Sequence, residues 1–201
     1  MRVHLVRHGR TRWNDERRLQ GWEGVELSEE GVAQIKALAQ KLKGLKPDAV
    51  YSSDLERAVQ SAKLLISEAG WDAPHIVDPR LREIYHGSWE GRRASEFKEL
   101  AERVKPGEFG PPDGEGFRPL ARRLAEFLED LRGTGYREVV LVGHQVTNAA
   151  LKLLLLGYPP EHPVFDYLAH AMLSSLALLA QTGYNICQLV QSNSQLEEFE
   201  L

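Results

Sequence analysis

The sequence predicts an α/β fold, a three-layer α/β/α sandwich with a mainly parallel central sheet and a small helical cap insertion. Short β-branched apolar runs alternate along the chain with longer segments whose apolar residues recur at helical spacing. The 201 residues suffice for one domain, and 42% hydrophobic with 27% charged residues is ordinary for a globular protein. We therefore expect a single domain over residues 1–201.

The first half of the chain supplies two pairs of a strand and a helix. A short apolar run before Gly9 is typical of a buried strand that feeds a loop. Ser28 is a suitable N-cap for the helix that follows, and Gly44 is expected to stop it. The four elements are a strand at Val3–Val6, a helix between Ser28 and Gly44, a strand at Asp48–Tyr51 and a helix over Leu55–Ile66.

The second half of the chain is less regular. From Gly87 to about Gly135 we expect an insertion or cap on the core, because charged helical material over Arg92–Val104 is followed by a Pro/Gly-rich run. A β-branched strand then ends in Gly143 and His144. The other expected elements are a helix over Phe117–Leu131, a helix over Val146–Leu156 and a hairpin of Ser175–Ala180 with Tyr184–Val190.

Composition and charge exclude several classes of protein. A net charge of −4 lacks the basic surplus of nucleic-acid binders. The chain opens without a signal-peptide pattern and has no apolar stretch of membrane-spanning length, so we expect a cytoplasmic protein with no membrane partner. The single cysteine, Cys187, allows no intramolecular disulfide. The histidines lack metal-ligand spacing, so neither a metal nor another cofactor is expected.

Charged residues follow the ends of several predicted strands. In an open α/β sheet, ligands bind beyond the carboxyl ends of the strands. The residues at these places are Arg7 and His8 after the first strand, Arg57 one helical turn past the second, Glu83 after the segment Ile76–Leu81, and His144 after the late strand. Arginine forks and histidines suit a tetrahedral phosphoryl dianion, because one guanidinium binds two of its oxygen atoms at once.

These residues can together transfer a phosphoryl group. The neutral imidazole of His8 can attack phosphorus and form a covalent phosphoenzyme. Arg7, Arg57 and His144 can position the group and stabilise its charge. Glu83 is the expected proton donor to the leaving alkoxide, because a carboxyl group near a dianion and partly out of water keeps its proton more readily. The sequence thus predicts a small phosphomonoester as the substrate.

Several segments match, one after another, the motifs of a known enzyme family. A strand is followed by Arg7-His8-Gly9-Arg10-Thr11 and, a few residues on, by Asn14. The other matching segments are Arg17–Trp22, Leu27–Gly31, Ser52–Ala62, Leu81–Gly91 and Val142–His144. Together they resemble the histidine phosphatase superfamily, also called the phosphoglycerate mutase-like family, over nearly the whole chain.

The resemblance implies a role for each candidate. It makes His8 the phosphorylated residue and Glu83 the proton donor. The catalytic set that it implies is His8, Glu83, His144, Arg7 and Arg57, and the substrate-binding set is Arg7, Asn14, Gln20, Arg57, His144 and Gln145.

Three positions depart from the family pattern. Arg10 stands where many members have Glu or Gln and, if it points inward, favours a more anionic substrate. Gln145 follows His144 where Gly is usual, although a His-Gln pair occurs in the family's fructose-bisphosphatase branch. Gly116 replaces a serine, which exchanges one helix N-cap for a slightly weaker one.

The segment after Glu83 distinguishes the branches of the family. Ile84–Gly91 looks like the phosphatase branch, whereas mutases carry a longer insertion and an Arg-His-Tyr-Gly sequence. We therefore expect hydrolysis, with a cofactor-dependent phosphoglycerate mutase as the first alternative and a catalytically inactive phospho-ligand-binding protein as the second. Sugar phosphates, phosphoglycerate derivatives, nucleotides and ribazole phosphate all stay open as substrates. The C-terminal Glu197–Leu201 is either a frayed tail or a homodimer contact.

The remaining conspicuous residues receive no catalytic role. His86 lies close enough to Glu83 in the sequence to touch substrate. Arginine pairs are expected on solvated helix faces, and tryptophans in the core or in loops, with at most one meeting substrate. These residues are Arg92, Arg93, Arg122 and Arg123, and Trp13, Trp22 and Trp89.

Overall fold

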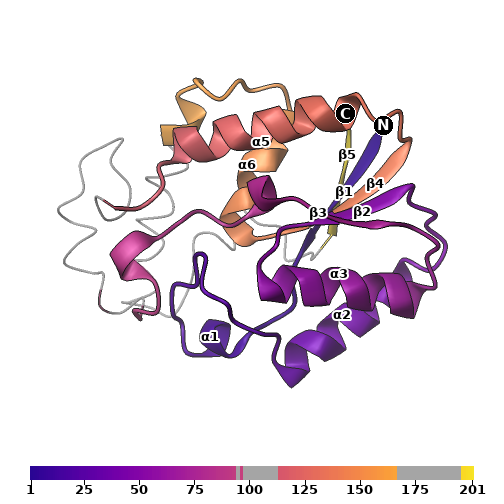
Figure 1. The fold of residues 1–201 in the computed structure, drawn as a ribbon, viewed down its shortest axis with the longest axis horizontal. Helices are drawn as coiled ribbons and strands as arrows, with labels where there is room; N and C mark the ends of the chain where they lie inside the picture. The colour runs from indigo at the N-terminus through magenta and orange to yellow at the C-terminus, as the bar shows by residue number, and fades with distance from the viewer. Residues whose placement is uncertain (94–95, 97–112, 167–195) are drawn as a thin grey trace.

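The centre of the protein is a five-stranded sheet. The computed structural model (Figure 1) describes residues 1–93, 96, 113–166 and 196–201. The strand order is β3-β2-β4-β1-β5, where β1 to β4 run parallel and β5 runs antiparallel to β1. The strands are β1 Arg2–Arg7, β2 Ala49–Ser52, β3 His75–Val77, β4 Glu138–Gly143 and β5 Leu196–Glu200. The expected α/β class with a mainly parallel sheet is confirmed.

Helices cover both faces of this sheet, with α2 and α3 on one side and α5 and α6 on the other (Figure 1). The pleat of β4 explains the two layers, because Val139 and Leu141 pack toward α5 and α6 while Val140 packs toward α2 and α3. The helices are α1 Arg12–Asp15, α2 Glu29–Lys41, α3 Glu56–Ala69, α5 Phe117–Arg132 and α6 Gln145–Leu155, with 3₁₀ turns η1 Pro79–Leu81 and η2 Gly87–Trp89. Within the described ranges, no helix has the length and apolar character needed to cross a membrane.

The helix after Ser28 begins where it was expected and ends earlier. Ser28 Oγ accepts a hydrogen bond from the N–H of Gly31 at 3.2 Å, which makes Ser28 the N-cap of α2. The helix ends at Lys41, before the expected stop at Gly44, and Leu42 turns its side chain into the core.

Helix α5 belongs to the core of the sandwich. Leu120 and Leu124 are fully buried in the apolar cluster that also contains residues of β1, β2 and β4. The range 87–135, expected to form a cap, thus includes a core helix, because the apolar stripe of α5 outweighs its charged neighbours. A cap is therefore limited to residues before Phe117. The expected helix over Arg92–Val104 lies almost entirely outside the described residues.

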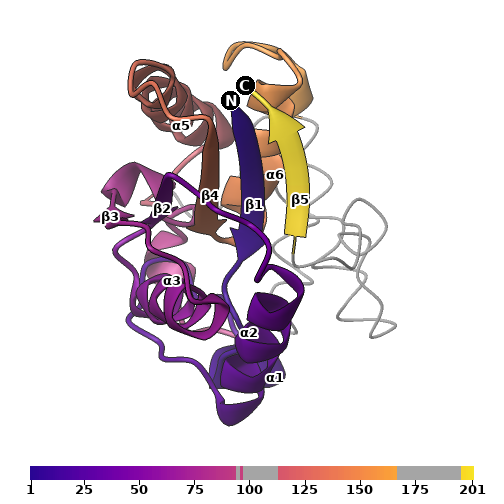
Figure 2. The same ribbon diagram turned by 90° about the vertical axis from the view of Figure 1, so that its right-hand side faces the viewer.

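The C-terminal residues form a strand at one edge of the sheet, beside β1 (Figure 2). Phe199 and Leu201 pack against the core. The two chain ends also join, since the amino group of Met1 donates to Leu201 O at 3.1 Å and the N–H of Leu201 donates to Met1 O at 2.8 Å. A frayed tail at Glu197–Leu201 is therefore wrong, while a homodimer stays a prediction. The expected hairpin of Ser175–Ala180 with Tyr184–Val190 lies outside the described residues.

Gly116 opens α5 without a side-chain cap. Its φ of −81° and ψ of 161° are accessible to any amino acid. A serine there finds only the N–H of Arg118 within the first turn, because Pro119 has none. We expect Gly116→Ser to raise the free energy of unfolding by roughly 0.3 to 0.5 kcal/mol, as measured by urea denaturation.

The control for this substitution is Gly44→Ser. A side chain at Gly44 meets open space, and no helix begins there. This variant reports how much stability comes from restricting the unfolded chain alone. Equal stability of the Gly116 and Gly44 variants would contradict the capping effect.

Candidate active site

The candidate residues meet at the carboxyl edge of the sheet. Because β1, which ends at Arg7, runs parallel to β4, which ends at Gly143, His8 and His144 emerge side by side. The N–H of His8 donates to Gly143 O at 3.1 Å, and the two imidazole rings lie 5.1 Å apart between centroids. Arg57 reaches the same place from the first turn of α3. The structure thus brings together residues that are far apart in the sequence.

His8 is fixed in one tautomer and is neutral. Its Nδ1 lies 2.7 Å from the carbonyl oxygen of Gly9, which only accepts hydrogen bonds, so Nδ1 carries the proton. Burial, followed by the charges of Arg57 and Arg7, lowers the pKa of His8 well below its usual value. The Nε2 atom therefore presents a lone pair, as a nucleophilic imidazole requires.

Close packing explains the glycine that follows His8. A Cβ atom on Gly9 would lie 2.5 Å from the carbonyl oxygen of Gly31 in α2. The N–H of Gly9 donates to Ser61 Oγ at 3.1 Å, and Ser61 Oγ in turn donates to Arg57 O at 2.7 Å. The loop that carries His8 is thereby attached to both α2 and α3.

Arg57 is a buried guanidinium, 1% exposed, that three acceptors hold in place. Nη1 donates to Glu23 O at 3.0 Å, Nη2 donates to Gly21 O at 2.7 Å, and Nε lies 3.3 Å from His8 Nε2. Burial lowers the pKa of Arg57 to about 10, which leaves it charged at neutral pH. Arg7, half-buried at the end of β1, is close enough for its charge to add to this shift.

His144 is the N-cap residue of α6 and contacts Ser53. Ser53 Oγ lies 2.6 Å from His144 Nε2 and accepts a hydrogen bond from the N–H of Leu55 at 3.3 Å. The other ring nitrogen, Nδ1, is buried and finds no hydrogen-bond partner in the part of the chain that the structure describes. Burial, and then charges led by that of Arg57, lowers the pKa of His144 well below its usual value, so this imidazole is neutral too.

The carboxylate of Glu83 is held at the N-terminus of α6. Oε2 accepts a hydrogen bond from the N–H of Val146 at 3.1 Å. Oε1 accepts from the N–H of Thr147 at 3.1 Å and from that of Ile84 at 3.0 Å. Free N–H groups at the start of a helix are donors for which the oxygen atoms of a carboxyl group are suitable acceptors. Since α6 begins directly after His144, this arrangement brings the carboxyl group to the candidate site.

Two side chains that sequence reasoning missed hold the backbone of Glu83. Trp22 Nε1–H donates to Glu83 O at 2.7 Å, and Arg123 Nη2 donates to the same oxygen at 3.1 Å. Arg123 also donates to Arg82 O at 2.9 Å and forms a two-point ion pair with Glu115. The expectation that Arg123 lies on a solvated helix face is wrong, because its side chain is only 17% exposed.

The auxiliary residues Asn14 and Gln20 converge on Thr11. Asn14 Oδ1 accepts a hydrogen bond from the N–H of Thr11 at 3.0 Å, within the capping box that opens α1. Gln20 Oε1 accepts from Thr11 Oγ1 at 2.9 Å. Each amide is therefore anchored through its oxygen. Gln145 is half-buried as the first residue of α6. Contact of these three amides with substrate stays a prediction.

Arg10 is directed toward two surface carboxylates. It pairs with Asp15 and with Glu30, where Nη1 lies 3.3 Å from Oε1, and its side chain is 44% exposed. The inward orientation that would favour a more anionic substrate is therefore not found.

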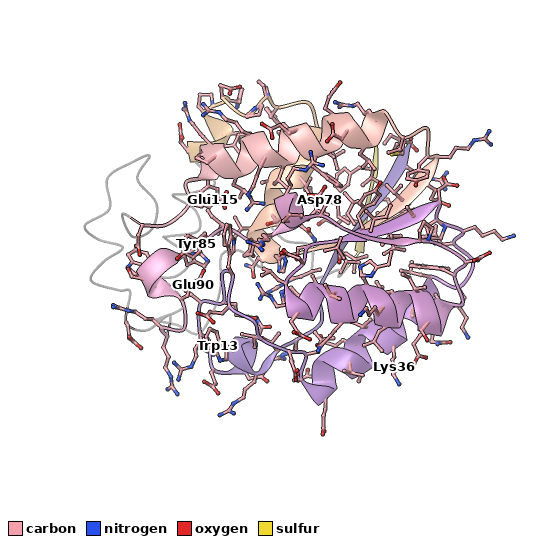
Figure 3. The ribbon with its side chains drawn as sticks, viewed as in Figure 1. Trp13, Lys36, Asp78, Tyr85, Glu90 and Glu115 are labelled. Carbon is pink, nitrogen blue, oxygen red and sulfur yellow. The ribbon has the colours of Figure 1, made fainter. Side chains whose placement is uncertain are left out.

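His86 and Glu90 lie next to the site. Burial lowers the pKa of His86 to about 4, so this imidazole is neutral. Glu90 Oε1 accepts hydrogen bonds from the N–H of Trp22 at 2.8 Å and from that of His86 at 3.1 Å, and burial raises the pKa of Glu90. Figure 3 shows Glu90 between Tyr85 and Trp13. These contacts attach the segment after Glu83 to the loop before α2.

A surface groove of about 360 Å³ lies beside α1, lined by Arg12, Trp13 and residues 23–28. It contains none of the candidate catalytic residues, and the acid side chains along it do not suit a phosphoryl dianion. Among the described residues, no three His, Cys, Asp or Glu side chains are grouped so that they would hold a metal ion.

Comparisons with known proteins agree with the sequence motifs. The family model "Histidine phosphatase superfamily (branch 1)" matches residues 3–189. "Probable phosphoglycerate mutase GpmB" of Enterobacter sp. (strain 638) is 34% identical over 166 residues, which are 79% of this chain and 76% of that protein.

Among the solved structures that share the fold are two phosphatases. The α-ribazole phosphatase of Shigella flexneri has a TM-score of 0.71 at 30% identity, covering 80% of this chain and 82% of its own. A mycobacterial glucosyl-3-phosphoglycerate phosphatase in complex with VO3 has a TM-score of 0.71 at 33% identity, covering 83% and 86%. With its family model matched over almost the full length, the chain belongs to the histidine phosphatase superfamily.

Proposed function

We propose that this protein is a metal-independent phosphomonoester hydrolase that carries the phosphoryl group on His8. The observation that carries the proposal is the fixed, neutral imidazole of His8, whose Nε2 lies 3.3 Å from Nε of the buried Arg57. An unprotonated imidazole nitrogen beside a buried cation combines a nucleophile with a binding group for an anion. A phosphate ester offers both an electrophilic phosphorus and the negative charge that this pair requires.

Each step of the reaction is assigned to a side chain. His8 Nε2 attacks the phosphorus, the bond from phosphorus to the ester oxygen breaks, and Glu83 gives its proton to the leaving oxygen. Arg7, Arg57 and His144 Nδ1 donate to the phosphoryl oxygens. Water then attacks the phosphorus and loses its proton to the Glu83 carboxylate, while the bond from phosphorus to His8 Nε2 breaks. Inorganic phosphate leaves, and His8 and the protonated Glu83 are restored.

The acceptor and the substrate class are part of the proposal. Two proteins of the same fold are phosphatases by name, acting on α-ribazole phosphate and on glucosyl-3-phosphoglycerate, and this supports water as the acceptor and a small phosphorylated metabolite as the substrate. The relative named as a phosphoglycerate mutase, at 34% identity, supports the mutase as the second candidate.

Incubation with 3-phosphoglycerate and a trace of 2,3-bisphosphoglycerate, with and without EDTA, tests the acceptor. We expect inorganic phosphate to be released at a rate that the chelator leaves unchanged, because no assigned step requires a metal. Rapid formation of the 2-phospho isomer without free phosphate would identify a mutase instead, and a large loss with EDTA would reveal a metal.

A panel of phosphomonoesters compared by kcat/KM then ranks the substrates. Phosphoenzyme formation is followed in the same panel, because phosphohistidine is labile in acid and stable in alkali. An absence of both turnover and phosphoenzyme with every member would identify a binding protein without activity.

A further inference from the structure

Arg123 lies in the middle of α5, and its guanidinium reaches the segment that ends at Glu83. Nη1 donates to the carbonyl oxygen of Arg80 and, at 2.9 Å, to that of Arg82. Nη2 donates to the carbonyl oxygen of Glu83 at 3.1 Å. Nε and Nη2 also pair with the two carboxylate oxygens of Glu115 at 2.7 and 2.8 Å. One planar side chain thereby fixes three carbonyl oxygens of this segment.

Glu115 also contacts the same segment directly, at Tyr85. Its N–H donates to Tyr85 O at 2.8 Å, and its Oε2 accepts from the N–H of Tyr85 at 3.4 Å; the two side chains are neighbours in Figure 3. The ion pair of Arg123 and Glu115 is largely buried, at 17% and 14% exposed. Removal of Arg123 leaves the charge of Glu115 and three backbone oxygens without these bonds, whereas removal of Glu115 leaves the buried guanidinium without its counter-charge.

The carboxyl group of Glu83 is held separately, by the N–H groups of Val146 and Thr147 in α6. Thr147 Oγ1 also donates to Arg82 O at 2.7 Å. Glu83 is thus clamped between α5, which holds its backbone, and α6, which holds its carboxyl group. A proton donor benefits from this restraint, because it must meet the leaving oxygen within hydrogen-bond distance.

We propose that Arg123, oriented by Glu115, is a positioning residue that places the carboxyl group of Glu83 for proton donation. The inference rests on the proposed function, in which Glu83 is the proton donor. The hydrogen bonds of Arg123 go to the Glu83 segment and to Glu115, so its loss displaces the donor without removing a side chain assigned to the phosphoryl oxygens. Its charge also reaches His144, and Arg123→Lys keeps that charge. The fall in kcat/KM on loss of Arg123 is then larger for a substrate whose leaving group must be protonated than for one whose leaving group departs as a stable anion.

Phenyl phosphate and p-nitrophenyl phosphate separate these effects, because they differ only in the nitro group that lets p-nitrophenolate leave without a proton. We compare kcat/KM, which reports phosphorylation of His8 even when the second step limits kcat. For Arg123→Met we expect kcat/KM to fall about 10-fold or more on phenyl phosphate and less than about 3-fold on p-nitrophenyl phosphate. Arg123→Lys shares this selectivity, since one ammonium group cannot bind both the carbonyl oxygens and Glu115.

Two further variants keep the test informative if Arg123→Met does not fold. Glu115→Gln keeps the shape of the side chain and removes its charge, and should give a smaller loss with the same selectivity. Arg122→Met is the matched control, because Arg122 is the neighbour of Arg123 on α5, is 58% exposed and pairs with Glu161 at the surface. It should leave kcat/KM on both substrates unchanged.

Glu83→Gln serves as the reference and should show the same selectivity with a larger loss. Equal losses of Glu83→Gln on both substrates would overturn the proposed role of Glu83 and the inference with it. If Glu83→Gln is selective but Arg123→Met, Arg123→Lys and Glu115→Gln change both substrates equally, or change neither, only the inference about Arg123 is overturned.

Discussion

His8→Ala is expected to lower kcat/KM for every phosphomonoester by about 10⁴-fold or more and to abolish the phosphoenzyme. The alanine removes a neutral imidazole nitrogen that Gly9 orients and that faces Arg57. His144 cannot replace it, because its Nε2 is engaged with Ser53. Rapid-quench trapping with labelled substrate, followed by acid and alkali treatment, measures the covalent intermediate.

His162→Ala is the control for this substitution. His162 is exposed and lies outside the site, so its loss should change neither turnover nor trapping. The thermal midpoints of both variants show whether each still folds. Full activity of His8→Ala, or an acid-labile phosphoenzyme in that variant, would refute the mechanism.

Arg57→Met is expected to lower kcat/KM by about 10³-fold, because it removes a buried donor to the charge that develops on the phosphoryl oxygens. It also leaves the carbonyl oxygens of Gly21 and Glu23 without these donors, so the loop before α2 loses two of its hydrogen bonds to α3 and keeps the one from the N–H of Leu27 to Gln60. The loss of rate and the loss of hydrogen bonds both follow from a single guanidinium that is 1% exposed. Both effects exceed those expected on removal of an arginine at the surface.

The same substitution changes the pH dependence of the reaction. Burial is the main cause of the lowered pKa of His8, and the charge of Arg57 is the next. Without that charge, the pKa of His8 rises toward its usual value. Since only neutral His8 attacks, activity should be lost at a higher pH in Arg57→Met than in the wild type as the solution is acidified.

A pH profile of kcat/KM, which reports groups of the free enzyme, measures this shift. Arg132→Met is the control, because Arg132 is 53% exposed at the end of α5 and pairs with Glu129 in its own helix. An unchanged acid limb in Arg57→Met, or a loss below about tenfold in kcat/KM, would contradict the role assigned to Arg57.

The alternation of strands and helices was readable from the sequence because these elements are locally encoded. A buried β-branched run such as β4, or an amphipathic stripe such as that of α5, can be recognised from the pattern of neighbouring residues alone. Strand β5 was not found, because its glutamates interrupt any apolar alternation and its partner is β1, at the other end of the chain. Pairing across such a distance leaves no local signal.

The candidate catalytic residues could be grouped from the sequence for a geometrical reason, since the carboxyl ends of parallel strands share one edge of the sheet. Arg123 was missed because it stands beside Arg122 on a helix, and only the position of the Glu83 segment decides which of the two is buried. The contact of Thr147 with a carboxyl group could have been predicted from the sequence, because Thr147 follows His144 in the first turn of α6. Side chains and N–H groups at such a position commonly bind carboxylates.

The pairing of β5 with β1 has a practical consequence. The first and last residues are joined by backbone hydrogen bonds at the end of β1 opposite to His8, and a six-residue strand spans about 20 Å. A short linker can therefore close the chain into a ring, and fusion partners or surface anchors can be attached at either terminus, at the end of the sheet remote from His8. New ends for a circularly permuted enzyme can then be chosen elsewhere on the surface.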